Sequence, residues 1–318
     1  MTIILEIKEI LKVFYNKNNA YLALFFKFIL ALFFFLNINS MLGFMEPLNS
    51  IFVVLVLALI CSLLSFFATM GIGFLLVIGH CYAIGIEVAL FALVLLLVLL
   101  IFYIRLAGDD SVGVIFTPIA FAWNVPMAVP MGLGLLRGSS SAFSVVCGTI
   151  FYCFMALVKE QASVLQSIDK SELAKKMQIL IDGLIKNRSM WVAIVAAVAV
   201  VIIVHGLRQM AINFAWDIAI VTGGICYLVI TVGAGGLMDL DVAVFGTLLQ
   251  VVVVCALAFL VKFCVFNVDY TKTESLQYED DDYYYYVKAI PKINIERQRR
   301  QDQLGGEMWR VEQEDYDE

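Results

Sequence analysis

Long apolar stretches separated by short polar segments make up most of the first 268 residues of this chain. A helix of about 20 apolar residues is long enough to cross about 30 Å of hydrocarbon. The pattern therefore predicts an all-α, polytopic transmembrane helix bundle of about eight spans, with seven to ten spans compatible. The predicted spans cover residues 20–37, 51–69, 72–104, 112–136, 139–158, 189–207, 211–237 and 242–266.

The third apolar stretch, residues 72–104, is too long for one ordinary crossing. It is compatible with a single tilted helix, or with a short half-helix over 72–84 followed by a full helix over 86–104. The choice matters because one additional crossing moves every later loop to the opposite side of the membrane.

Two amphipathic segments lie outside these spans. Before the first span, isoleucine, leucine and phenylalanine recur at helical spacing on one face, and lysine occupies another. This predicts an interfacial helix over residues 1–19, with a helical extension of the first span as the alternative. Residues 160–188 are also amphipathic, and we expect them to lie on the membrane or to cap the bundle.

Composition agrees with a membrane domain and separates a tail from it. Hydrophobic residues make up 62% of the 318 residues, charged residues 15%, and the mean hydropathy is +0.93. A soluble protein carries about 25% charged residues. Residues 269–318 hold fourteen acidic and seven basic residues. We therefore predict a transmembrane domain over residues 20–268 and an acidic, tyrosine-rich tail over residues 269–318.

The positions of lysine and arginine bear on topology. Lys8, Lys12 and Lys17 favour a cytoplasmic N-terminus by the positive-inside rule. Eight spans would return the tail to the cytoplasm but leave the lysine-rich 159–188 connection outside. Splitting the third stretch would reverse both placements. We expect the N-terminus and the tail to be cytoplasmic.

Glycine and proline interrupt three of the apolar stretches. They cluster over residues 71–85, 118–138 and 223–236. Proline removes a helical hydrogen-bond donor, and freed backbone is tolerated at membrane depth only inside protein or beside a wet cavity. Small residues also allow simple close packing of helices, so both interpretations stay open. The candidate helix breaks are Pro118, Pro126, Pro130, Gly223 and Gly224.

Few ionisable residues fall inside the predicted spans. The candidates for an intramembrane polar or coupling role are Glu87, Asp217, His80 and Lys27. The alternative is a static role, in which the carboxylates pair with Lys27 or Arg208 and long lysine stems reach the interface.

Several classes of function lack their usual signature. The sequence has no phosphate-binding glycine loop, HExxH motif or GxSxG motif, so we expect no enzyme and no cofactor. With two histidines and seven cysteines, all in apolar runs without CxxC spacing, we expect no metal site and read the cysteines as small buried side chains. We expect no nucleic-acid partner and no cleavable signal peptide.

The phrase YEDDDYYYYVKAIPK, residues 278–292, is the most distinctive part of the tail. Its strand-favouring residues suit a hairpin that docks a protein partner, and its acidic residues suit a basic surface. A solvated, partly disordered tail is the alternative. The candidate docking residues are Tyr278, Asp280, Asp281, Asp282, Tyr283, Tyr284, Tyr285 and Tyr286.

The last span and its continuation VDYTKTESLQYEDDDYYYYVKAIPK resemble an uncharacterised family of polytopic membrane proteins from clostridial-type Gram-positive bacteria. The phrases MEPLNS and AWDIAIVTGG are similar to that family too, so the resemblance covers most of the chain. Such proteins are sometimes loosely labelled permeases of ABC transporters, but no EAA-x₃-G coupling motif occurs here. The resemblance implies a bacterial cytoplasmic membrane protein and adds no mechanism.

Two hypotheses about function follow from these patterns. The first is a non-catalytic membrane subunit of a transport, secretion or envelope assembly, in the lipid bilayer, with the tail docking a cytoplasmic partner. The alternative is a self-sufficient solute or ion-coupled transporter whose cavity lies at the Pro118–Pro130 and Gly223–Gly224 breaks. The sequence leaves the substrate, the partner and the oligomeric state open.

Overall fold

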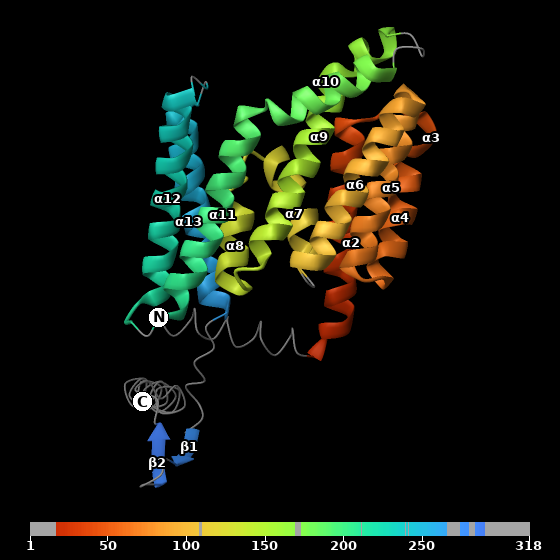
Figure 1. The fold of residues 1–318 in the computed structure, drawn as a ribbon. Helices are drawn as coiled ribbons and strands as arrows, with labels where there is room; N and C mark the ends of the chain where they lie inside the picture. Colours follow the sequence, from red (N-terminus) through yellow and green to blue (C-terminus); the bar gives the residue numbers. More distant parts are fainter. Residues whose placement is uncertain are drawn as a thin grey trace, which may run out of the picture. The chain divides into compact units, whose positions relative to one another are not determined.

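The computed structural model describes residues 17–107, 110–168, 173–210, 212–238, 240, 242–265, 274–279 and 284–289. These residues fall into two units (Figure 1). Asn18–Lys262 form a helical bundle, and the second unit contains the C-terminal end of the last helix and a β-hairpin. Most of the predicted interfacial helix over residues 1–19 lies outside the described residues.

The described residues contain twelve helices and two strands. The helices are α2 (Asn19–Met41), α3 (Glu46–Asn49), α4 (Ile51–Leu63), α5 (Phe66–Ile84), α6 (Ile86–Leu106), α7 (Ser111–Ala122), α8 (Ala128–Leu136), α9 (Ser141–Ser167), α10 (Leu173–Ile185), α11 (Arg188–Gln209), α12 (Ala215–Met238) and α13 (Val244–Val265). Seven of them, α2, α5, α6, α9, α11, α12 and α13, are long and apolar enough to cross a membrane. The chain is a multi-pass helical membrane protein.

The long third stretch is two helices, because the chain is extended at Gly85 between α5 and α6. The first of these helices is a full one that starts at Phe66, where Ser65 accepts a hydrogen bond from the Ala68 amide at 3.3 Å. This start shortens α4 to 13 residues, so the predicted span over 51–69 is wrong at its end. The apolar run continues through the turn, and hydropathy alone does not mark it.

The predicted span over residues 112–136 is also two helices, and neither crosses the membrane alone. Twelve residues of α7 rise about 18 Å, well short of about 30 Å of hydrocarbon. The chain then turns and α8 runs back. The two ends of the pair meet, because the Asp110 carboxylate lies 3.4 Å from Arg137 and also accepts a hydrogen bond from Ser141. We call α7 and α8 the re-entrant pair.

The bundle has two ends, which we call the N-terminal face and the α10 face (Figure 1). Helix α2 begins at the N-terminal face. The start of α7 and the end of α8 lie at the same face. The α10 face carries α3, α10 and the α5–α6 connection. The seven long helices and the shorter α4 run between the two faces, and the re-entrant pair enters and leaves through the N-terminal face. The seven long helices and α4 make eight passes between the two faces, so Asn18 and Lys262 lie at the same face (Figure 1).

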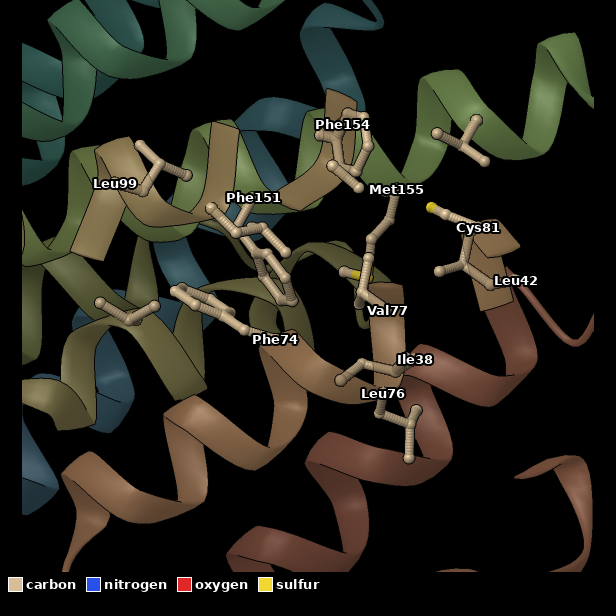
Figure 2. Packing of buried hydrophobic residues seen from close by; sticks show 14 of the residues in the cluster. Ile38, Leu42, Phe74, Leu76, Val77, Cys81, Leu99, Phe151, Phe154 and Met155 are labelled. Carbon is tan, nitrogen blue, oxygen red and sulfur yellow. The ribbon is translucent and has the colours of Figure 1, made fainter. Parts of the chain in front are cut away.

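An aromatic core joins helices that are far apart in the sequence. The ring of Phe151 on α9 lies 5.0 Å from Phe74 on α5 and 6.1 Å from Phe34 on α2, measured between ring centroids. Figure 2 shows Phe151 and Phe74 side by side, with Val77 and Met155 beyond them. The Phe34 ring lies directly against Gly73, where any Cβ would overlap it. These contacts position α9, along which the functional site is built.

Small residues allow α7 to lie directly against α9. Gly113 and Thr117 on α7 face Ser144 and Gly148 on α9, four residues apart on each helix. A Cβ on Gly148 would come within 2.7 Å of the Thr117 Cβ. This arrangement is the close crossing that pairs of small residues permit in membranes.

The predicted break at Gly223 and Gly224 is absent, because α12 is continuous through both residues. A Cβ on Gly223 would come within 3.0 Å of Met131, and one on Gly224 within 2.8 Å of the Cys255 sulfur. The two glycines therefore provide room for α8 and α13. Close packing, the alternative left open by the sequence, accounts for this glycine pair.

The described part of the tail is a two-stranded antiparallel hairpin. Strand β1 covers Glu274–Glu279 and strand β2 covers Tyr284–Ala289, with Tyr278 opposite Tyr285 and Gln277 opposite Tyr286. Four of the predicted docking residues, Asp280, Asp281, Asp282 and Tyr283, lie between the strands and outside the described residues.

The re-entrant pair makes a prediction about topology. We expect single cysteines at Asn19 and Arg105 to react with a membrane-impermeant maleimide from one side of sealed vesicles, and a cysteine at Gln166 from the other. All three side chains are exposed, and the chain would carry Cys264→Ser to remove an exposed thiol.

The cysteine at Arg105 distinguishes the re-entrant arrangement from a continuous crossing. A continuous crossing over residues 112–136 and an unbroken third span would place it on the same side as Gln166. Labelling of both positions from one side would therefore contradict the re-entrant arrangement. Detergent-opened vesicles, in which all three cysteines should react, provide the control.

Candidate functional site

A cavity of about 540 Å³ lies among α7, α9, α10 and α11. This volume is typical of small-molecule sites, which range from about 300 to 1,000 Å³. Its walls extend from the tip of the re-entrant pair to the α10 face. The lining residues are Phe121, Tyr152, Cys153, Ala156, Leu157, Glu160, Gln161, Asp182, Gly183, Lys186, Asn187, Ser189, Met190 and Ala193.

The tip of the re-entrant pair is built by an asparagine and two prolines. Asn124 has a left-handed backbone with φ of 55°, a conformation that asparagine tolerates better than most residues. Its N–H donates to Phe121 O at 3.1 Å, and the Val125 N–H donates to Ala120 O at 2.8 Å. This is the Schellman arrangement that closes a helix end, and a proline commonly follows it. Pro126 occupies that place.

The three candidate prolines have different roles. Pro126 lies in the turn between the two helices, where the predicted break occurs. Pro130 is the third residue of α8, in the first turn, where a backbone N–H has no partner within the helix. Pro118 lies inside α7 without ending it. The break is therefore the segment from Trp123 to Met127, between the two proline-containing helices.

Two stacked aromatic rings form part of the cavity wall at the tip. Phe121, from the last turn of α7, lies 4.5 Å from Tyr152 of α9 between ring centroids, at an interplanar angle of 17°. Beside them the wall is apolar, with Cys153 and Ala156 from α9 and Ala193 from α11. The deep end of the cavity thus offers an aromatic surface.

Charged and amide side chains line the other end of the cavity. Glu160 of α9 is exposed, and Asp182 of α10 forms an ion pair of 3.0 Å with Lys186, which directly follows that helix. Gln161 and Asn187 add amide groups. The cavity is therefore amphipathic along its length, from aromatic at the tip to charged at the α10 face.

Helix α10 is held over this end of the bundle by a buried ion pair and by close packing. Lys176 Nζ lies 3.4 Å from Glu87 Oε2, and the two side chains are only 4% and 6% exposed. A Cβ on Gly183 would come within 2.5 Å of Leu157 on α9. Removing one partner of a buried ion pair leaves an uncompensated charge, so the pair resists separation of α10 from α6.

A polar network at the N-terminal face joins the start of α7 to the end of α8. Asp110 precedes α7, Arg137 follows α8, and Ser141 begins α9. Arg208 of α11 donates to Leu135 O and, at 3.2 Å, to Arg137 O, which are carbonyls at the end of α8. The network satisfies groups that the short helices leave open, and it joins α7, α8, α9 and α11 at the face opposite the cavity.

The four predicted intramembrane polar residues do not share a site. His80 is fully buried, and its Nδ1 accepts a hydrogen bond from the Met45 N–H at 3.2 Å while its Nε2 lies 3.0 Å from Asn39 Oδ1. A backbone donor at Nδ1 assigns the proton to Nε2. His80 therefore joins α2 and α5 to the segment before α3.

The other three candidates are also paired at separate places. Lys27 donates to Leu64 O at 3.2 Å and lies 5.4 Å from the Phe66 ring centroid. Asp217 lies 2.5 Å from Lys262, so its partner is neither Lys27 nor Arg208. Glu87 pairs with Lys176, as above. None of the four lines the cavity.

Sequence reasoning missed most of the residues that line the cavity. The repeat of Tyr152, Ala156 and Glu160 at intervals of four residues places them on one face of α9, a signal that was available. Asp182 and Lys186 lie in the segment predicted to cap the bundle. Only the proline cluster pointed to this region. Among the described residues, no group of three or more His, Cys, Asp or Glu side chains could hold a metal ion.

Comparison with known proteins adds no relative. No protein-family model matches the chain, and no curated protein or solved structure matches it. The site therefore has to be understood from its own geometry.

Replacing Asp110 should destabilise the bundle. We expect Asp110→Ala to lower the free energy of unfolding by about 1–3 kcal/mol, chiefly because the buried Ser141 hydroxyl loses its acceptor. The matched control is Asp182→Ala, which removes a partly exposed pair and should change stability by less than about 0.5 kcal/mol. Titration of the detergent-purified protein with SDS measures both. Equal losses would show that Asp110 has no special role.

Proposed function

We propose that this multi-pass membrane protein forms a solute pathway and acts as the membrane-embedded part of a transport system. The observation that carries the proposal is the re-entrant pair, whose tip contributes Phe121 to the wall of a cavity that extends to the α10 face. Helices that stop at membrane depth are typical of transporter sites, because they bring broken backbone and helix ends to a solute.

The physical argument concerns what a broken helix requires. Backbone interrupted in the hydrocarbon region is tolerated where it is covered by protein or faces a water-filled space. Helices α9 and α11 pack along the re-entrant pair, and the Schellman turn satisfies backbone groups at its tip. Trp123 and Asn124 at the tip are exposed, and Phe121 lines the cavity.

The two ends of the proposed pathway differ. At the α10 face the cavity is lined by charged and amide groups. At the N-terminal face Asp110, Arg137 and Arg208 tie α7, α8, α9 and α11 together. This asymmetry is that of a transporter with one side accessible and the other closed. We propose that solute enters from the α10 face.

The pathway predicts that water reaches the middle of the membrane at one position. In a chain carrying Cys153→Ser and Cys264→Ser, we expect Ala156→Cys to react with a membrane-impermeant methanethiosulfonate added at the α10 face, because Ala156 lines the cavity. The reagent added at the N-terminal face should not react.

The matched control is Ala197→Cys on α11, where the alanine is buried at 5% exposure within a hydrophobic cluster. It should stay unreactive from both faces. If Ala156→Cys behaves like Ala197→Cys, the cavity has no aqueous connection and the pathway proposal fails.

A second function is favoured by the hairpin of β1 and β2. A two-stranded sheet leaves the outer edge of each strand with unpaired backbone donors and acceptors, which can extend the sheet of another protein. We propose that this chain is a non-catalytic subunit of a transport, secretion or envelope assembly, and that the hairpin docks a partner protein. The two functions are compatible, since transport systems commonly join membrane and soluble subunits.

Docking by the hairpin predicts sensitivity to a backbone change. We expect Val287→Pro in β2 to abolish recovery of the partner with the cross-linked, detergent-purified protein, because proline removes a ladder donor. Val287→Thr keeps a strand-favouring residue and should retain the partner. Quantitative mass spectrometry of both preparations measures the difference, and equal recovery would exclude docking by strand addition.

Location and orientation complete the proposal. The lysines before α2 support a cytoplasmic N-terminal face, and with eight crossings the end of the bundle at Lys262 shares that side. The cavity would then open to the outside. The resemblance of the tail to clostridial-type membrane proteins supports a place in a bacterial cytoplasmic membrane.

A further inference from the structure

We infer that the cavity binds an amphiphilic organic cation, with the apolar body of the ligand against Phe121 and Tyr152 and its positive group beside Glu160. This inference rests on the proposed pathway and names the chemical class of its ligand. It follows from the length of the cavity, from its lining and from the charges at its rim.

The length of the cavity follows from α9. Tyr152, Ala156 and Glu160 all line it and are spaced four residues apart. Eight residues of helix extend about 12 Å, so the aromatic surface and the Glu160 carboxylate lie at opposite ends of a site that is long enough for an amphiphile. A small hydrophilic ion would leave the apolar end unoccupied.

The deep end suits flat or bulky apolar groups. Phe121 and Tyr152 present stacked rings, and Cys153, Met190 and Ala193 complete an apolar wall. The stack covers one face of each ring, and the electron-rich outer face of an aromatic ring attracts cations and disfavours anions. Both properties favour an aryl or alkyl cation over an anion of equal size.

The charges at the rim determine the sign of the ligand. Lys186 is neutralised by Asp182 in the last turn of α10, at 3.0 Å. Glu160 is exposed, and no ion pair among the described residues involves it. The rim therefore carries one uncompensated carboxylate, and Gln161 and Asn187 add carbonyl acceptors that suit an ammonium or similar donor.

Two ions of the same shape and opposite charge provide the test. Tetraphenylphosphonium and tetraphenylborate would each be dialysed against the full-length protein in nonionic detergent. We expect saturable binding of one tetraphenylphosphonium per chain. Binding of tetraphenylborate should be at least about fivefold weaker, because its charge is repelled by Glu160 in a partly screened site. Equal affinities would overturn the inference.

Two glutamate variants identify the group responsible. Glu160→Gln should weaken tetraphenylphosphonium binding at least about fivefold. Glu46→Gln removes a glutamate from α3, which does not line the cavity, and should leave the affinity unchanged. Equal effects of the two variants would mean that overall charge, and not this site, attracts the cation. Ala156→Trp should fill the cavity and abolish binding of both ions.

The same chemistry is available in a free solute or in an aminophospholipid headgroup. Competition against bound tetraphenylphosphonium by short-chain phosphatidylethanolamine, with phosphatidylglycerol as the control, distinguishes the two sources. Displacement of tetraphenylphosphonium by the first lipid alone identifies a lipid ligand, and displacement by neither identifies a free cation. Displacement by both lipids equally would overturn recognition of the cation.

Failure of this inference can be separated from failure of the pathway. If Ala156→Cys reacts with the aqueous reagent but tetraphenylphosphonium does not bind, the pathway stands and the ligand class is wrong. If Ala156→Cys does not react, the pathway itself is wrong.

Discussion

Water is absent from the hydrocarbon core of a membrane, so every backbone amide and carbonyl there must find a partner in the protein. Helices that cross completely meet this requirement along their length. The re-entrant pair cannot, because α7 ends and α8 begins between the two faces of the bundle. Asn124 resolves the end of α7 by adopting a left-handed backbone, which lets the Val125 N–H reach Ala120 O. The rest of the re-entrant pair depends on the helices that pack along it.

Helices α9 and α11 approach α7 and α8 closely. Gly148 lets α9 lie against α7, and Gly134 lets α8 lie against α11, where a Cβ would come within 3.2 Å of Val201 O. The aromatic core around Phe151 then fixes α9 against α2 and α5. Because α9 also carries Tyr152 and Glu160, the same packing that holds α7 against α9 orients the cavity beside the tip.

The apolar pattern was sufficient to predict the helical membrane fold, the interruption near the proline cluster and the amphipathic character of residues 160–188. Three details were out of reach. Hydropathy does not change at Leu64, so the start of α5 was hidden. Gly223 and Gly224 lie in a continuous helix, and their lack of side chains leaves room for Val204, Met131 and Cys255 of neighbouring helices. Asp217 pairs with Lys262, 45 residues away, and spacing along one helix cannot indicate such a partner.

By itself, the sequence determined which segments are apolar enough to enter the membrane and that the chain breaks near Pro126. Both depend on local properties, namely the hydrophobicity of about 20 consecutive residues and the backbone restriction that proline imposes. Only the tertiary structure decided that residues 112–136 form a re-entrant pair, that Asp110 joins its two ends, and that Tyr152, Glu160 and Asp182 line one cavity with Phe121. These are contacts between distant segments, and they arise because each buried polar group and each small residue is satisfied by a neighbour from another helix.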